Sequence, residues 1–281
     1  MSFFRQFPKI QYDFFNRGVN YEITDFFRYV TGDITLLDDV SVYSYYRVQN
    51  GERPDVVSMK LYGTPEYYWT FFVINDHLKR GIATWPLSPE AFEDYMKEEY
   101  DGYAISSKVN VRVNEDGERL ETTTLADEFP IGTPVIATHV PDGTNISITT
   151  STGGIVYARN PQLYQLIIKG DIVKTSGSHL TPFVATGKIK SDKNEMTIEG
   201  WTEFRNAVHH YEDSEGNLTY DPYYFDSDET EGKVENLGPL TAISNYEYES
   251  NLNDARADIR IIKPSLINQF AQQYRTLINA N

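Results

Sequence analysis

The residues best suited to hold a metal ion are five histidines: His77, His139, His179, His209 and His210. None stands in an H-x-x-x-H or similar ligand spacing, and the chain has no cysteine, which excludes Cys-based zinc sites. His209 and His210 are neighbours, and on a regular strand their side chains point to opposite faces. Asp213 to Asn217 superficially suggests a calcium loop, but the ligand spacing fails and a hairpin turn explains it better. The sequence therefore predicts no metal site.

Motifs for nucleotide binding and nucleophilic catalysis are also missing. There is no G-x-x-x-x-G-K-[ST], G-x-G-x-x-G or G-x-S-x-G, and Gly153-Gly154 is typical of a turn. A chain with 41 acidic residues always offers some carboxylate pair, so a glycosidase stays a competing hypothesis without specific support. The acidic run 212–235 is interpreted as a solvated face. We expect no catalytic residue, no cofactor and no enzymatic activity.

Charge and composition narrow the class of partner. The net charge of −16, from 25 basic and 41 acidic residues, argues against binding to nucleic acid or to acidic membrane surfaces. No apolar run reaches about 18 residues, so no membrane span is expected, and the first residues do not form a signal peptide. The absence of cysteine excludes disulfides and is compatible with a reducing cytoplasm.

The elements that would position a binding surface begin with an aromatic, mostly irregular arm over residues 1–40. β-forming residues and Asn50-Gly51 predict a strand over 41–50. A helix follows from Pro54 to a left-handed cap at Gly63. A second helix, 65–75, is apolar on nearly every face, so we expect it to be buried on several sides. Ser88 opens a third helix that ends near Tyr100.

The remainder is predicted to be rich in short strands. Runs between about 105 and 201, separated by Gly, Asp, Asn and Pro, indicate a small antiparallel barrel or sandwich. Residues 241–252 are predicted as a short helix, 258–262 as a strand, and Pro264 as the start of a final amphipathic helix. The fold class is therefore α+β, in four parts: an arm over 1–40, a helical module over 41–103, an inserted β-rich domain over 104–205, and a C-terminal segment over 206–281.

The order strand, turn, helix ending in Tyr-Gly, and second helix ending at Asn75 resembles the LysM pattern, a βααβ unit, over residues 45 to about 87. The resemblance implies a second strand near Ile82–Leu87. The usual P-G-[QD]-x-L ending of LysM domains is replaced by Gly81-Ile82-Ala83-Thr84-Trp85-Pro86-Leu87.

A second resemblance rests on the following residues: Arg53-Pro54, Leu61-Tyr62-Gly63, Pro65, Tyr68-Trp69, Asn75-Asp76, Phe7-Pro8, Thr24-Asp25-Phe26-Phe27-Arg28, Ile259-Arg260-Ile261-Ile262-Lys263 and Phe270. Together they resemble the LysM-like baseplate wedge proteins of T-even-type contractile-tailed bacteriophages, over residues 1–103 and 206–281. The β-rich stretch between these segments departs from the compact form of that family.

This resemblance implies a structural protein of the phage tail baseplate that connects neighbouring wedges and helps close the sixfold ring around the hub. The implied partners are other wedge proteins, including the helical core bundle and the sheath-initiating, lysozyme-like subunit. The implied location is the virion, after assembly in the host cytoplasm. The alternative, which rests on the LysM pattern alone, is a peptidoglycan-binding module of a lytic tail protein.

Aromatic and arginine side chains favour the centres of protein interfaces. The residues predicted to bind a partner are Phe3, Phe4, Phe7, Phe26, Phe27, Arg53, Tyr62, Tyr68, Trp69 and Trp85.

Overall fold

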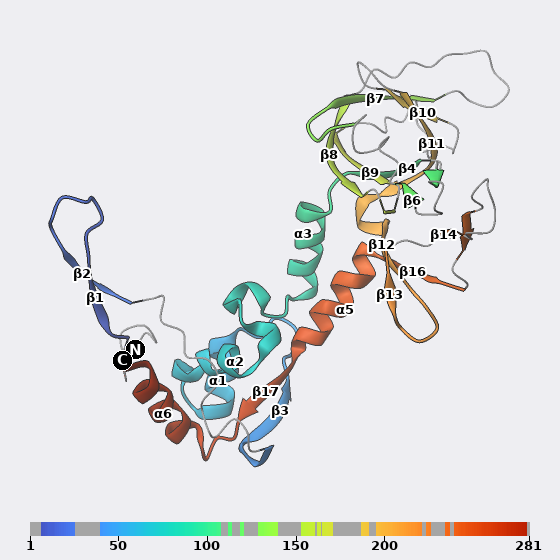
Figure 1. Ribbon diagram of the computed structural model, residues 1–281. Helices are drawn as coiled ribbons and strands as arrows, with labels where there is room; N and C mark the ends of the chain where they lie inside the picture. Colours follow the sequence, from blue (N-terminus) through green and yellow to red (C-terminus); the bar gives the residue numbers. More distant parts are fainter. Residues whose placement is uncertain are drawn as a thin grey trace. The chain divides into compact units, whose positions relative to one another are not determined.

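The computed structural model (Figure 1) describes residues 7–25, 40–107, 112–113, 119–120, 129–139, 153–160, 162–163, 165–170, 187–190, 195–220, 223–225, 234–236 and 239–279. The chain divides into two compact units. Unit 1 joins both ends of the chain, Met1–Phe92 and Asn251–Asn281, and unit 2 is Glu93–Ser250. The helices and antiparallel sheets of the chain confirm the predicted α+β class. The predicted four-part division stays a prediction.

The strands and α-helices of unit 1 are β1 (Lys9–Tyr12), β2 (Tyr21–Thr24), β3 (Tyr43–Arg47), α1 (Pro54–Tyr62), α2 (Trp69–Ile74), β17 (Asp258–Ile262) and α6 (Ile267–Asn279). Short 3-10 helices lie at Val40–Val42, Pro65–Tyr67, Asp76–Leu78 and Gly81–Thr84. Two further helices, α3 (Pro89–Glu99) and α5 (Asn245–Ala257), each contribute residues to both units.

The central sheet of unit 1 pairs two strands from opposite ends of the sequence. β17 runs antiparallel to β3, with Ile262 opposite Tyr43 and Asp258 opposite Arg47 (Figure 1). The order of elements is therefore strand, helix, helix, strand, with all of unit 2 entering before the last strand.

The predicted second strand near Ile82–Leu87 is wrong. Gly81 adopts a positive φ of 70° and the chain forms a 3-10 helix over Gly81–Thr84. Pro86 follows and has no N–H to donate to a strand partner. The partner of β3 is instead the isoleucine-rich β17, the strand predicted over 258–262.

Local signals explain where the first helices begin and end. α1 starts at Pro54, and Gly63 ends it at φ 72° while donating its N–H to Met59 O. The Thr64 hydroxyl then accepts from the N–H of Glu66 and caps the next turn. The predicted helix 65–75 is split into a 3-10 turn and the short α2, whose Trp69, Thr70, Phe71 and Ile74 are buried.

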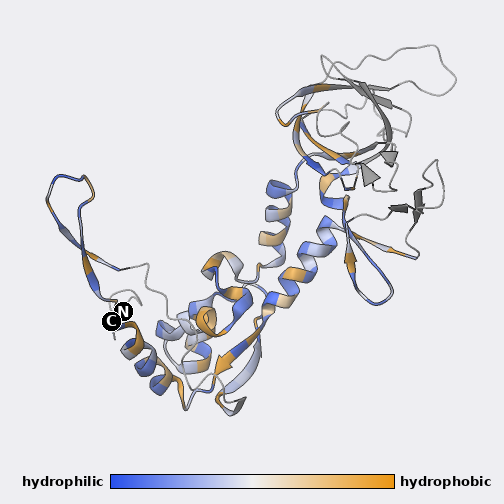
Figure 2. Cartoon of the chain, viewed as in Figure 1, coloured by the Kyte–Doolittle hydropathy of each residue, from blue (hydrophilic) through white to orange (hydrophobic). Residues whose placement is uncertain are grey.

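The core of unit 1 depends on α6. Its buried face consists of Ile267, Phe270, Ala271, Tyr274 and Ile278. These positions recur at helical spacing, and Figure 2 shows that α6 contains both apolar and polar residues. They pack in one cluster with Trp69, Ile74 and Ile262, while Phe71, Trp85 and Ile259 belong to a second cluster.

Unit 2 contains a sheet in which six strands pair in a closed ring. The strands are β4 (Tyr103–Ser107), β7 (Pro134–His139), β8 (Gly153–Asn160), β9 (Gln165–Gly170), β10 (Gly187–Lys190) and β11 (Glu195–Glu203). All pairings are antiparallel, in the order β10, β11, β4, β9, β8, β7, and β7 pairs with β10 to complete the barrel (Figure 1).

The other strands of unit 2 form small sheets. They are β5 (Arg112–Val113), β6 (Arg119–Leu120), β12 (Val208–Glu212), β13 (Leu218–Thr219), β14 (Tyr223–Phe225), β15 (Val234–Asn236) and β16 (Thr241–Ser244). β5 pairs with β6 and β14 with β15, while β12 lies between β13 and β16. The predicted helix over 241–252 is wrong at its start, because residues 241–244 form β16 before α5 begins. Within the described residues, no helix combines the length and apolar character needed to cross a membrane.

Candidate partner-binding site

The N-terminal arm contains a β-hairpin rather than the irregular chain expected from its sequence. β1 pairs antiparallel with β2 from Lys9 opposite Thr24 to Tyr12 opposite Tyr21. The N–H of Asp25 extends the ladder by donating to Pro8 O at 2.9 Å. We call residues 8–25 the arm hairpin.

Asp13 organises the turn of the arm hairpin. Its carboxylate accepts from the backbone N–H groups of Phe15 and Gly18 at 3.1 and 2.6 Å. Asn16 and Gly18 take positive φ values of 49° and 74°, which Asn and Gly tolerate best. Desolvation acts to raise the pKa of Asp13, but the backbone donors outweigh it and lower that pKa below its usual value. The turn is therefore held by a carboxylate that is charged at neutral pH.

Apolar side chains gather on the arm hairpin without being buried. The exposed members are Tyr12, Phe14, Phe15, Val19 and Tyr21. The Tyr12 and Phe14 rings meet edge to face at 5.0 Å, and the Arg17 guanidinium lies 5.5 Å from the Phe15 ring centre. Phe15 remains 64% exposed. These contacts hold the rings in a defined cluster while leaving large apolar area open, which is typical of an interaction surface.

None of these five exposed residues was among those predicted to bind a partner. Alternating Tyr12, Phe14 and Tyr21 around Asn16-Arg17-Gly18 is the sequence signal that predicts such a hairpin. Four predicted residues, Phe3, Phe4, Phe26 and Phe27, lie outside the described part of the chain.

The structure places most of the other predicted residues inside unit 1. Phe7, Trp69 and Trp85 are each at most 7% exposed. The Tyr62 hydroxyl donates to Ile262 O at 3.0 Å, and burial raises the pKa of Tyr62 well above its usual value. Tyr68 is half-buried and packs against both apolar clusters of the unit. These side chains all take part in the apolar clusters of unit 1.

Arg53 is the member of the set whose side chain is largely exposed, at 77%. Its guanidinium pairs with Asp55 at 3.2 Å at the start of α1. An exposed pair of this kind contributes little to stability. Partner binding by the ten predicted residues stays a prediction.

Two polar side chains cover the outer edge of β17 in the β3–β17 sheet. The side-chain amide of buried Asn75 pairs with Arg260, accepting from its N–H at 2.8 Å and donating to its C=O at 2.9 Å. Asn75 also donates to Phe71 O, which ties the end of α2 to β17. Asn75 and the Tyr62 hydroxyl thus occupy the backbone groups on the outer edge of β17.

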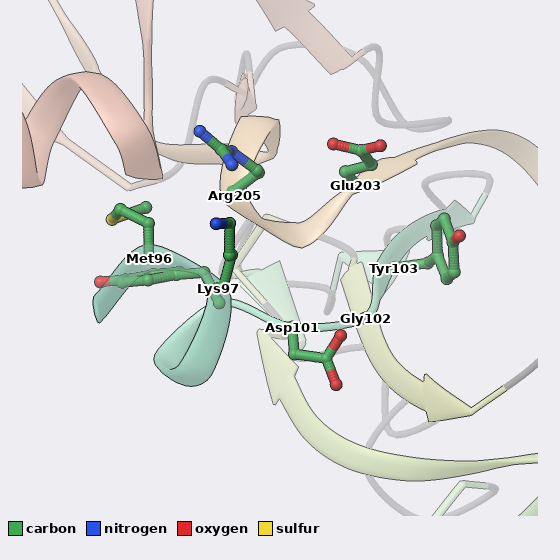
Figure 3. A pocket seen from close by; sticks show the side chains of 8 residues that line it. Met96, Lys97, Asp101, Gly102, Tyr103, Glu203 and Arg205 are labelled. Carbon is green, nitrogen blue, oxygen red and sulfur yellow. The ribbon is translucent and has the colours of Figure 1, made fainter. Parts of the chain in front are cut away.

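Unit 2 contains a cavity of about 280 Å³ beside the connection from α3 to β4 (Figure 3). The charged residues that line it are Lys97, Asp101, Glu203 and Arg205. Arg205 pairs with Glu93 at 3.1 Å and stacks over the Tyr246 ring, and Lys97 approaches Asp94 at 3.6 Å. Both cations therefore already have a carboxylate neighbour within unit 2.

His209 and His210 do not point to opposite faces as predicted. A β-bulge interrupts the register of β12 between Val208 and His210, so the regular alternation of side chains is lost. Their Nδ1 atoms lie 2.8 Å apart, and His210 Nε2 lies 3.1 Å from a Glu212 carboxylate oxygen. In the described part of the chain no group of three or more His, Asp or Glu residues is arranged to hold a metal ion.

The segment Asp213–Asn217 is a hairpin turn, as predicted. The Asp213 carboxylate accepts from the N–H groups of Glu215 and Asn217, both at 2.8 Å. Its oxygen atoms are therefore used inside the turn between β12 and β13.

Comparison with known families identifies one part of the chain. Residues 2–132 match the model of a family described as base plate wedge protein 53. No curated protein matches the chain. The matched stretch contains the arm hairpin, β3, α1, α2, α3 and the first strands of unit 2. The match does not reach 206–281, where the same resemblance stays a prediction. Over residues 2–132 the match supports the predicted resemblance to a family of baseplate wedge proteins.

Proposed function

We propose that this protein connects neighbouring wedges of a contractile-tail baseplate and helps close the sixfold ring around the hub, without catalysing a reaction. The family match supports a structural role in a baseplate. The wedge-connecting role goes beyond that match. The same proposal includes a LysM-like arrangement of β3, α1, α2 and β17, and assembly in the host cytoplasm.

The observation that carries the proposal is the exposed aromatic surface of the arm hairpin. Phe14 and Phe15 are 55% and 64% exposed, although large aromatic side chains gain most when buried. Phe7, directly before the hairpin, is buried in the cluster that contains Trp69 and Tyr274. The hairpin is thus anchored at its base to unit 1 and presents apolar area at its tip, as a connector requires.

The proposed partners are other wedge proteins, namely the helical core bundle, the sheath-initiating lysozyme-like subunit and neighbouring wedges. Ring closure makes the last contacts intramolecular and raises their effective concentration. Individually modest contacts would then suffice to hold six wedges together.

The test is a double substitution at the tip, Phe14→Ser with Phe15→Ser. We expect affinity for co-expressed wedge proteins to fall by about 10–100-fold, because each ring buries apolar area on binding. The free energy of unfolding of the isolated chain should change little, since both rings are exposed.

The matched control is Ile82→Ser, which removes an apolar side chain that is 69% exposed elsewhere in unit 1. We expect this variant to bind wedge proteins like the unsubstituted chain. Equal binding by the tip variant and the unsubstituted chain would overturn the proposed role of the hairpin.

Peptidoglycan binding is supported less well. Trp85 could stack on a sugar only if its ring were exposed. Trp85 is only 5% exposed, and its indole N–H donates to Glu52 O at 2.7 Å. That ring packs against Phe71 and Phe72 and is not available for stacking on a sugar. We expect no retention of the chain on purified cell-wall sacculi.

A further inference from the structure

The outer edge of β3 has unused backbone hydrogen-bonding groups. Both backbone groups of Arg260 point away from β3, because the Asn75 amide binds them. Tyr45 lies opposite Arg260, so its own N–H and C=O point away from β17. Within the described residues no partner reaches these two groups, and the Tyr45 side chain is 78% exposed. The Arg47 C=O on the same edge accepts from the Gln49 side-chain amide at 2.9 Å, so the edge that β3 offers to another strand is centred on Tyr45.

The arm hairpin is the complementary feature. It is a sheet of two strands with almost every side chain exposed or half-exposed, and such a ribbon is only marginally stable alone in water. Because Asp25 N–H donates to Pro8 O, the residues facing inward on β2 are Tyr21 and Ile23. The backbone groups of Glu22 and Thr24 consequently face outward.

We propose that β2 of one copy of this chain adds antiparallel to the free edge of β3 in a second copy. Charge selects the strand and the register. Pairing Thr24 with Tyr45 places Glu22 of one copy opposite Arg47 of the other, and opposite charges directly across a ladder are favourable. In β1 the corresponding outward residue is Lys9, which would meet Arg47 with like charge.

The contact joins different surfaces of the two copies, so each copy keeps one unused hairpin and one unused edge. Contacts of this type close into rings when the rotation between copies allows it. This inference rests on the proposed function and specifies it, because a ring of copies is one way to connect six wedges.

The test uses the absence of cysteine from the natural chain. Two full-length variants, Thr24→Cys and Tyr45→Cys, are mixed in equal amounts under mild oxidation, alone and with wedge proteins. Directly opposed residues in a hydrogen-bonded antiparallel pair have Cα atoms about 5.5 Å apart, within the range of a disulfide. We expect the mixture to give at least tenfold more disulfide-linked dimer than either variant by itself.

The matched control replaces Tyr45→Cys with Ser44→Cys, one residue along β3. The Ser44 side chain points to the face of the sheet opposite to Tyr45, and the N–H and C=O of Ser44 face β17. The mixture of Thr24→Cys and Ser44→Cys should give only background dimer. Equal yields from the two mixtures, or no dimer under either condition, would overturn the inference.

Charge reversal provides an independent measurement on the same contact. Within one copy Glu22 pairs with Lys9 at 3.0 Å and Arg47 with Asp258 at 2.6 Å. Glu22→Arg and Arg47→Glu should each weaken association between copies, and the chain carrying both should regain it. If the two substitutions acted only by breaking the ion pairs within each copy, their effects on association would add in the doubly substituted chain. The reason is that Glu22 and Arg47 have different partners there, Lys9 and Asp258.

The outcomes separate this inference from the proposed function. Loss of wedge binding in the Phe14→Ser, Phe15→Ser variant without any disulfide-linked dimer would keep the connector role and remove the strand addition. A specific disulfide-linked dimer in a chain that binds no wedge protein would keep the strand addition and remove the connector role.

Discussion

At the scale of single residues, the amide of Asn75 takes the place of a neighbouring strand on the outer edge of β17. It is 1% exposed and makes three hydrogen bonds, two to Arg260 and one to Phe71. A side chain that satisfies buried backbone groups in this way is difficult to replace, because the groups it leaves cannot reach water.

Asn75→Ala should therefore lower the free energy of unfolding of unit 1 by about 2–4 kcal/mol, since it leaves backbone groups of Arg260 without partners. Urea denaturation followed by tryptophan fluorescence measures this change. Gln49→Ala removes an exposed amide that donates to Arg47 O and should cost less than about 1 kcal/mol. Equal losses for the two variants would contradict the role assigned to Asn75.

The His209–His210 pair has a fixed pattern of donors. His210 Nε2 faces the Glu212 carboxylate, so in the neutral pair His210 Nδ1 accepts a hydrogen bond from His209 Nδ1. His209 stacks on the Tyr248 ring, and Tyr220 lies beside both imidazoles. Glu249, which accepts from the Tyr100 hydroxyl, supplies the nearby negative charge from α5. If both rings were fully protonated, two N–H groups would face each other and this hydrogen bond would be lost.

Unit 2 should therefore lose stability on acidification. Burial, followed by the neighbouring His210, lowers the pKa of His209 below its ordinary value of 6.5. The unfolded chain then binds a proton more readily than the folded one, so stability is full above pH 6.5 and decreases as the pH falls from there to the folded pKa. His77 in unit 1 has a pKa lowered mainly by burial and acts with the same sign.

His209→Phe keeps an aromatic ring beside Tyr248 and removes the titrating group. Thermal unfolding from pH 8 to pH 5 should show a weaker pH dependence for this variant, and His77→Gln should remove only the contribution of unit 1. An unchanged pH profile in His209→Phe would argue against a proton-linked role of the pair.

At the scale of elements, the connection from α3 to β4 depends on one glycine. Gly102 has φ +104°, and a Cβ atom there would overlap with the Ile168 carbonyl oxygen on β9. Its own C=O accepts from the N–H of Phe204 at 2.9 Å. The backbone must therefore pass close to β9 before the barrel begins, and only glycine fits.

Gly102→Ala should destabilise unit 2 by at least about 2 kcal/mol more than Gly132→Ala, because only the former adds an overlap with backbone. Gly132 has a similar φ of +88° with no atom within 4 Å of a Cβ, which makes it a matched control for the cost of the dihedral angle. The measurement is the urea midpoint of each variant. Equal midpoints would show that the close approach to Ile168 adds nothing to the destabilisation caused by Gly102→Ala.

Elements with strong local signals could be predicted from the sequence. Pro54 and Gly63 mark the ends of α1, and the spacing of Phe270, Tyr274 and Ile278 indicates the buried face of α6. The bulge at His209 and the identity of the strand beside β3 could not be predicted, because both depend on partners distant in the sequence. For the same reason Trp69 and Trp85 read as interface residues from their type alone, although tertiary packing buries them.

At the scale of the whole molecule, unit 1 is completed only by the end of the chain. Arg47 and Asp258 are 211 residues apart, yet they face each other across the β3–β17 ladder. β17 and α6 together supply Ile259, Ile262, Phe270 and Tyr274 to the two apolar clusters. The wedge-like N-terminal part therefore depends on a segment beyond the matched residues.

A chain ending at Ala257 should fail to fold unit 1, because it lacks β17 and α6. We expect the emission of Trp69 and Trp85, both buried in the complete chain, to shift to the red. A chain ending at Asn279 keeps all of α6 and is the control. Unshifted emission from the shorter chain would show that the first 92 residues fold without the C-terminal segment.

The proposed connection of baseplate wedges by this protein can be tested on the mass distribution of purified wedges. Single wedges lacking the protein are mixed with it and measured by mass photometry. We expect a shift from single wedges to closed six-wedge rings, which the Phe14→Ser, Phe15→Ser variant should fail to produce. Wedges that close equally well without the protein, or that remain single in its presence, would show that the protein does not connect them.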